Sequence, residues 1–190
     1  MKRALLALVI LVLPLLQWQA QAATFADKNL ARLSAEAEQI FVGSVSSLRS
    51  RKLPNGAIVT DVRFSDLQLI KGEHRGADIV LLVLGGEVDG VRLEIAGLPP
   101  FELDTRYLVF SKGNGKDMFP VVGGPAGFFK IKAAPAGGAS IALTSTGAAL
   151  GRRISAEVHD NLPAPAQGAA RPPVTLDLFL AAIRARLGRQ

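Results

Sequence analysis

Residues 40–71 read IFVGSVSSLRSRKLPNGAIVTDVRFSDLQLIK, and this stretch decides the fold. Its first residues are rich in strand-forming side chains, and a polar alternation begins at Val45. Pro54-Asn55-Gly56 then supplies an Asn-Gly pair, a strong signal for a tight turn. From Ile58 onward, apolar and polar residues alternate, which is typical of a strand with one buried face. The stretch therefore predicts a hairpin of two long β-strands.

The chain beyond this hairpin continues in the same manner. Short apolar runs alternate with turns rich in Gly, Pro and Asn, and no helical stretch is long enough to connect parallel strands. Together with the hairpin, they make about eight strands. This spacing predicts a mainly β fold, either a small antiparallel β-barrel or a sandwich; barrel closure would also remove exposed edge strands. The further strands are expected at 78–84, 91–95, 107–110, 119–122, 128–131 and 140–144.

One helix is expected on each side of the β region. Between Asp27 and Glu38, apolar residues recur at helical spacing, with Asp27 as the expected N-cap. Near the other end, residues 161–173 contain four prolines and four alanines, which indicates a semi-rigid linker.

After this linker, residues 174–190 predict an amphipathic helix, with Thr175 as its N-cap. Two alternatives follow for its apolar stripe. Either the helix docks on the β-domain, or the stripe is exposed as a ligand for a groove on a partner protein. Docking is favoured, because an exposed stripe of large apolar side chains is costly in water. The stripe consists of Leu176, Phe179, Leu180, Ile183 and Leu187.

Residues 1–22 predict a secretory signal peptide. Lys2 and Arg3 precede an apolar run of 13 residues, and Ala20-Gln21-Ala22 has small residues where a signal peptidase cleaves. The run is too short to span a bilayer comfortably, and no later segment reaches the necessary length. We therefore expect an exported protein, periplasmic or secreted, with no transmembrane segment after cleavage. Its β-domain would occupy residues 23–160.

The composition excludes several classes of site. The chain has no cysteine, so disulfides, thiolate metal sites and cysteine nucleophiles are excluded. An exported protein without disulfides fits a bacterial envelope best. The formal charge is +6, or +4 without Lys2 and Arg3, and the surplus gathers at residues 49–52 and 184–189. Because no aromatic side chains interleave with these groups, an ordinary solvated surface is favoured over a nucleic-acid site. A lipid-surface role for Arg184, Arg186 and Arg189 stays open.

No cofactor or metal site is expected. His74 and His159 are the only histidines, both are expected in exposed loops, and no HExxH or Gly-x-Ser-x-Gly motif accompanies them. Carboxylates are the remaining candidates for catalysis, because convergent pairs can do acid–base chemistry. A solvated acidic loop is favoured, and a carboxylate-dependent hydrolase acting on an envelope substrate is the alternative. These carboxylates are Glu87, Asp89, Glu94, Glu102 and Asp104.

The middle of the chain also resembles known groups of proteins. GGEVDG at 85–90, GLPPF at 97–101 and RYLVF at 106–110 follow a GGxxxG…GxPxF…LxF pattern. In this, the chain resembles small exported bacterial proteins of unassigned function, although they often have a glycine where this chain has Asp104-Thr105. More distantly, VGSV at 42–45 and the long strand ending in Lys71-Gly72 are similar to netrin-like domains of OB type. That resemblance implies a barrel and inhibition of an enzyme, but not through the cysteine-based N-terminus of that superfamily.

The sequence thus favours a non-enzymatic binding module that engages a protein partner, with a secreted enzyme as one candidate. We expect the loops at 85–90 and 97–101 to form the binding surface. For these motifs taken by themselves, a structural role is favoured over a protruding binding loop: the glycines permit tight turns, and Phe101 plugs the end of the barrel. The candidate binding residues are Gly85, Gly86, Glu87, Asp89, Gly90, Pro99, Pro100 and Phe101.

Overall fold

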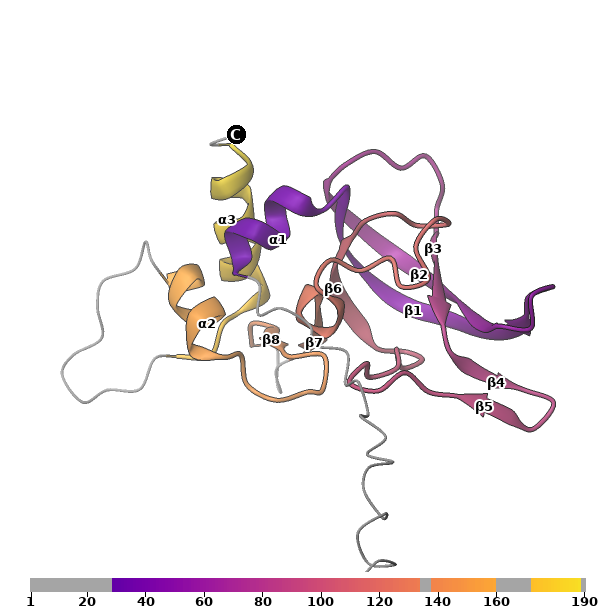
Figure 1. The fold of residues 1–190 in the computed structure, drawn as a ribbon. Coiled ribbons are helices and arrows are strands. Elements are labelled where there is room, and N and C mark those ends of the chain that lie inside the picture. The colour runs from indigo at the N-terminus through magenta and orange to yellow at the C-terminus, as the bar shows by residue number, and fades with distance from the viewer. Residues whose placement is uncertain (1–28, 134–137, 160–171, 189–190) are drawn as a thin grey trace, which may run out of the picture.

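The computed structural model describes residues 29–133, 138–159 and 172–188. A six-stranded antiparallel sheet, in the order β3-β2-β1-β6-β7-β8, forms its centre, and a two-stranded sheet, β4-β5, adjoins it (Figure 1). The expected signal peptide at 1–22 and most of the expected linker at 161–173 lie outside the described residues. The strands are β1 (Gln39–Lys52), β2 (Ile58–Lys71), β3 (Ile79–Leu84), β4 (Gly86–Val88), β5 (Val91–Leu93), β6 (Arg106–Ser111), β7 (Phe128–Lys132) and β8 (Ile141–Leu143).

The predicted hairpin is confirmed as β1 and β2. The two strands pair antiparallel from Lys52↔Ile58 to Ile40↔Lys71, with three register shifts along the way. The turn is fixed by Asn55, whose Oδ1 accepts a hydrogen bond of 3.1 Å from the Ala57 N–H. The pair extends to the right in Figure 1, where the β4–β5 hairpin lies beside its far end. Its outer half therefore forms a surface together with this smaller sheet.

The inner half of β1 is buried on both faces, which explains its continuous apolar run. Ile40 and Val42 join a core cluster on the face that the helices cover. Phe41 and Val45 join a second cluster on the opposite face, which also contains Phe64. The central strand thus separates two hydrophobic cores.

Three helices gather at one side of the sheet (Figure 1). They are α1 (Leu30–Glu36), α2 (Arg152–His159) and α3 (Leu176–Leu187). The N-cap of α1 is Asn29, whose Oδ1 accepts a hydrogen bond of 2.8 Å from the Arg32 N–H. The expected cap, Asp27, lies outside the described residues.

The C-terminal helix docks, as the first of the two alternatives expected. Thr175 caps α3, with its side chain accepting from the Leu178 N–H. Phe179, Leu180 and Ile183 are buried in the core cluster beneath the helices, and Leu176 and Leu187 pack against it. In this structure the apolar stripe therefore forms part of the hydrophobic core.

The expectation for one histidine is wrong. His159 is buried at the end of α2, where Nδ1 bonds to the Ser155 carbonyl oxygen at 2.6 Å. The sequence of α2 has few large apolar residues and a polar majority, so its pattern predicts a loop there and an exposed His159. His74 does lie in an exposed loop, as expected.

The mainly β, antiparallel fold is confirmed, but the described strands do not close into a barrel, because no pairing joins β3 to β8. The strand expected at 119–122 is absent; only an isolated bridge from Val121 to Ser111 forms there. Conversely, β4 was expected to be a loop. Within the described ranges, no helix is both long enough and apolar enough to cross a membrane.

Candidate functional site

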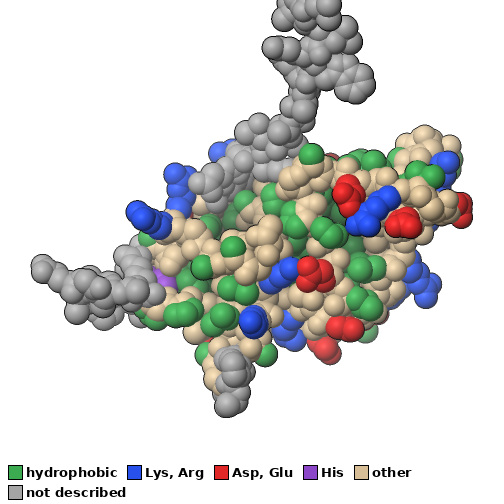
Figure 2. All heavy atoms as spheres, turned by 90° about the horizontal axis from the view of Figure 1, so that it is seen from below, with side chains coloured by type: hydrophobic (Ala, Val, Ile, Leu, Met, Phe, Trp, Pro, Cys, Tyr) green, Lys and Arg blue, Asp and Glu red, His purple; other side chains and the backbone are tan. Residues whose placement is uncertain are grey.

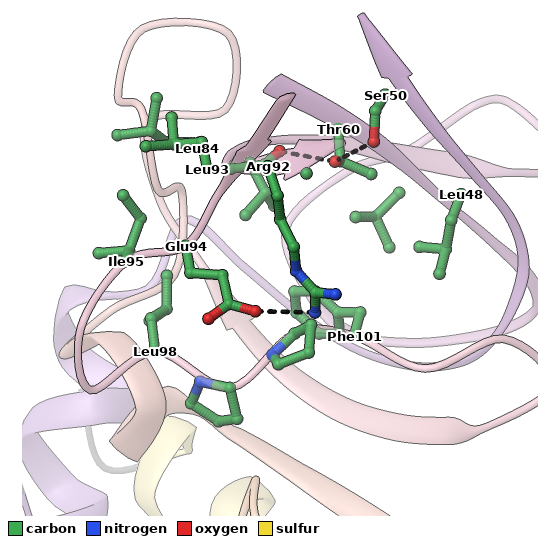
Figure 3. Close-up of a pocket in the computed structure, with 16 residues that line it drawn as sticks. Leu48, Ser50, Thr60, Leu84, Arg92, Leu93, Glu94, Ile95, Leu98 and Phe101 are labelled. Carbon is green, nitrogen blue, oxygen red and sulfur yellow. Dashed lines mark hydrogen bonds and ion pairs between the residues drawn. The ribbon is translucent and has the colours of Figure 1, made fainter. Parts of the chain in front are cut away.

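A pocket of about 330 Å³ lies where three parts of the chain meet (Figure 3). Its first side is the outer half of the β1–β2 hairpin, with Leu48, Ser50, Thr60 and Val62. The second is the bend from β3 into β4 at residues 83–86. The third comprises residues 92–95, from β5 onward, and the loop at 98–101. Most of the lining side chains are apolar.

Hydroxyl groups hold the start of β4 above the hairpin. Thr60 Oγ1 donates a hydrogen bond of 2.7 Å to the Gly85 carbonyl oxygen. The same Oγ1 lies 3.0 Å from Ser50 Oγ (Figure 3). Ser50 Oγ also accepts a hydrogen bond of 3.3 Å from the Glu87 N–H. Gly86 has a φ of 128°, and a Cβ atom there would collide with both hydroxyls. The close approach that shapes the pocket therefore requires glycine.

Phe101 closes the inner end of the pocket. Its side chain is only 6% exposed and its ring lies against three other rings, with centroid distances of 5.4 Å to Phe64, 5.1 Å to Tyr107 and 4.6 Å to Phe128. The ring is therefore anchored in the core rather than protruding, as the structural interpretation expected, although the described strands do not close into a barrel for it to plug. Because Phe101 also lines the pocket, it joins the pocket to the aromatic core.

Tyr107 holds the backbone next to Phe101 in place. Its hydroxyl oxygen accepts a hydrogen bond of 3.1 Å from the Glu102 N–H, directly after Phe101 in the chain. Burial raises the pKa of Tyr107 to about 12. The neutral phenol is therefore the form that fits the folded structure.

The two loops singled out in the sequence do meet, although not all of their residues reach the pocket. Five of the eight candidates line it: Gly85, Gly86, Pro99, Pro100 and Phe101. The other three lie on the β4–β5 hairpin outside the lining, where Asp89 and Gly90 form the turn with φ values of 52° and 75°.

Sequence reasoning missed the contribution of the β1–β2 hairpin to this site. Leu48 gave the only signal, as a large apolar residue within an otherwise polar run, and its side chain is 38% exposed. Nothing in the sequence indicated that β4 and the loop at 98–101 would cover this part of the hairpin.

The acidic residues of this region do not converge at the pocket. Glu94 is the only one of the five candidate carboxylates in the lining, and it pairs with Arg92 at 2.7 Å. Glu102 pairs instead with Lys130 at 2.6 Å. Within the described part of the chain, no group of three or more Asp, Glu or His side chains is placed to hold a metal ion.

The surface around this end of the molecule carries both signs of charge. On the face seen in Figure 2, the described basic side chains (blue) and acidic ones (red) are interspersed with hydrophobic ones (green). A nucleic-acid site would instead need a continuous basic stripe. The described side chains of the visible face do not form such a stripe.

No protein-family model, curated protein or solved structure matches this chain. Function must therefore be inferred from the geometry of the pocket and its surroundings.

Proposed function

We propose that this protein is an exported binding module of the bacterial envelope, whose pocket receives an apolar group of a protein partner. The observation that carries the proposal is the preformed, mostly apolar pocket between the β1–β2 hairpin, β4–β5 and the loop at 98–101. Binding sites in proteins are typically concave, with apolar walls and a few fixed polar groups. At about 330 Å³, this pocket is at the small end of that range, which suits one bulky side chain.

The lining supports binding over hydrolysis. Acid–base hydrolysis of a glycosidic bond needs two carboxyl groups flanking the bond. Glu94 is the only carboxylate in the lining, and its ion pair with Arg92 holds it at the rim. The carboxylate-dependent hydrolase therefore has less support than the binding module.

Export is part of the proposal and depends on the amino-acid sequence alone. Residues 1–22 have the three parts of a secretory signal, and the chain has no cysteine. The relationship to small exported proteins, and the OB- or netrin-like barrel, likewise stay predictions from the sequence motifs.

The test introduces a charge into the pocket without touching the core. Leu98→Asp changes a half-buried lining residue, whereas Leu103→Asp changes a residue that is 53% exposed and lies outside the lining. The purified wild-type protein would first be used to capture its partner from native envelope extract. Affinity for the partner so identified would then be measured by calorimetry.

We expect Leu98→Asp to weaken binding by about tenfold or more, because a carboxylate would be desolvated on complex formation. Leu103→Asp should bind as the wild type does, and circular dichroism should show both variants folded. Equal affinity of the two variants would refute the pocket as the binding site. Turnover that disappears in Glu94→Gln would support the hydrolase instead.

A further inference from the structure

The outer half of β1 has an open edge. β6 pairs with β1 only from Gln39 to Ser44. Val45 still exchanges backbone hydrogen bonds with Thr105 and Asp104, at 3.0 and 2.9 Å. Beyond that point, from 46 to 52, no described strand pairs with β1 on the side opposite β2.

The pairing shows which backbone groups face this edge. In an antiparallel pair, each residue directs its N–H and C=O to one side, and the sides alternate along the strand. The Ile58 carbonyl oxygen accepts from the Gly85 N–H at 2.9 Å, so Ile58 faces away from β1. Its cross-strand partner Lys52 must then face away from β2. By alternation, Ser50 and Leu48 also direct their N–H and C=O groups to the open edge.

The two outer edges of the six-stranded sheet are covered. Along β3, the Asn114 side chain bonds to the Val80 carbonyl oxygen and the Leu82 N–H. Along β8, the Ala142 N–H donates to the Val174 carbonyl oxygen, and the Leu176 N–H donates to the Ser140 carbonyl oxygen, both at 2.8 Å. An uncovered edge normally invites pairing with another chain. The contrast therefore singles out 46–52.

The pocket opens beside this edge. Leu48 and Ser50 present their backbone groups to the edge and their side chains to the pocket. A strand added here would lie about 4.8 Å from β1, with every second side chain on the pocket face. One large apolar side chain of such a strand would therefore reach the pocket next to Leu48.

The charged side chains on the outer half of β1 indicate what kind of segment could pair with its open edge. Arg51 is neutralised by Asp61 at 2.9 Å. Arg49 and Lys52 are exposed and form no ion pair within the described residues; Asp61, which lies across the strand pair from Arg49, is bonded to Arg51. Two copies of this edge would repel each other, because like charges would face across the new pair. An acidic segment would be attracted instead.

We propose that residues 46–52 of β1 are a β-strand addition site for an extended, acidic segment of a protein partner, with one large apolar side chain entering the pocket. In this mode, backbone hydrogen bonds supply affinity and the side-chain pocket supplies specificity. The inference rests on the proposed function of the pocket and adds how the partner is held.

The test uses the full chain and a fluorescein-labelled peptide, acetyl-Asp-Thr-Glu-Leu-Glu-Thr-Asp-amide, followed by fluorescence anisotropy. Two further peptides carry N-methyl groups on the odd or on the even residues. An added strand directs only alternate N–H groups to its partner, so one of these two peptides should lose about tenfold or more in affinity. The other should bind as the parent peptide does.

Matched variants test the charges. The double variant with Arg49→Glu and Lys52→Glu should bind the parent peptide with about tenfold lower affinity. Lys132→Glu, which changes an exposed cation on β7, should not. On peptide addition, the amide protons of Leu48, Ser50 and Lys52 should gain protection from exchange, measured by NMR.

Three results would overturn strand addition: no binding of the parent peptide, equal binding of both N-methylated peptides, or unchanged exchange at the three amides. The pocket proposal is judged separately, by the loss of partner binding in Leu98→Asp. If that variant loses its partner while both N-methylated peptides bind equally, the pocket stands and the edge does not.

Discussion

The hydroxyl oxygens of Ser50 and Thr60 lie 3.0 Å apart across the β1–β2 pair, with Gly86 directly against both. This contact makes the bend from β3 into β4 pass close over the hairpin, and the pocket lies beside it. The shape of the pocket therefore depends on a residue without a side chain.

Replacing Gly86 with alanine should destabilise the protein by about 2–4 kcal/mol, measured by urea unfolding. The new Cβ would collide with both hydroxyls, and a φ of 128° is strained for any L side chain. Gly90→Ala is the matched control, since Gly90 also has a positive φ, of 75°, but has no neighbouring atom within 4 Å of a Cβ. Gly90→Ala should lower the free energy of unfolding by only about 1 kcal/mol. Equal costs would contradict the close approach of β4 to the hairpin.

In the free protein, the rate of amide hydrogen exchange should alternate between successive residues along the outer half of β1. The N–H groups of Arg49 and Arg51 point into the pair with β2, whereas those of Ser50 and Lys52 point to the open edge. We expect the second pair to exchange about a hundredfold faster or more. Uniform protection from 48 to 52, measured by NMR, would show that another segment covers this edge.

Phe101 should behave as a core residue, although it lies in a loop. Phe101→Ala would remove a ring that contacts three other rings, and should cost about 3–5 kcal/mol in the free energy of unfolding. Leu103→Ala, two residues later and 53% exposed, should change stability by less than about 0.5 kcal/mol. A small loss for Phe101→Ala, seen in denaturant unfolding, would return this residue to the class of protruding binding side chains.

Tyr107 should make stability fall at high pH. Because burial raises its pKa to about 12, the folded state keeps the proton through a range where the unfolded chain, with a pKa near ~10, loses it. This contribution to stability is complete below pH ~10 and is lost as pH rises toward 12, by up to about 1.4 kcal/mol per pH unit.

Tyr107→Phe isolates this effect. At pH 7 the variant should be less stable by about 1 kcal/mol, because the Glu102 N–H loses its acceptor. Above pH ~10 the difference should narrow and then reverse, in thermal unfolding at a series of pH values. Parallel pH profiles for the two proteins would show that Tyr107 ionises as freely when folded as when unfolded.

The sequence predicted those parts of the fold that depend on local patterns. The alternation from Ile58 and the Asn-Gly turn identified the hairpin, and the stripe from Leu176 to Leu187 identified α3 with its cap. Both signals lie within one element. The burial of β1 on both faces was not predicted, although its unbroken apolar run from 40 to 42 is typical of such a strand.

The remainder depended on contacts between distant segments. α2 has few large apolar residues and ends at His159, so neither its helical form nor the burial of this histidine was apparent. The pocket joins residues 48 and 101, and only the bend at Gly85 and Gly86 brings β4 over the hairpin. The sequence could identify the two glycine-containing loops as important but not the surface that they cover.

The edge of β3 gives the last prediction. The Asn114 side chain donates from Nδ2 to the Val80 carbonyl oxygen at 2.7 Å and accepts at Oδ1 from the Leu82 N–H at 3.2 Å. It thus occupies two of the backbone groups that a neighbouring strand would use. Asn114→Ala should cost about 1–2 kcal/mol in unfolding free energy and should increase self-association, because an uncovered edge pairs with other chains.

Sedimentation velocity over a range of concentrations would measure this self-association. Asn55→Ala is the control: it removes another side chain that accepts a backbone hydrogen bond, from the Ala57 N–H, but in the hairpin turn rather than along an edge. It should lower stability without changing association. If Asn114→Ala sediments as the wild type does at every concentration, the amide of Asn114 does not protect the edge. The loop at 113–118, whose Met118 carbonyl oxygen accepts from the Leu84 N–H, would then be sufficient cover.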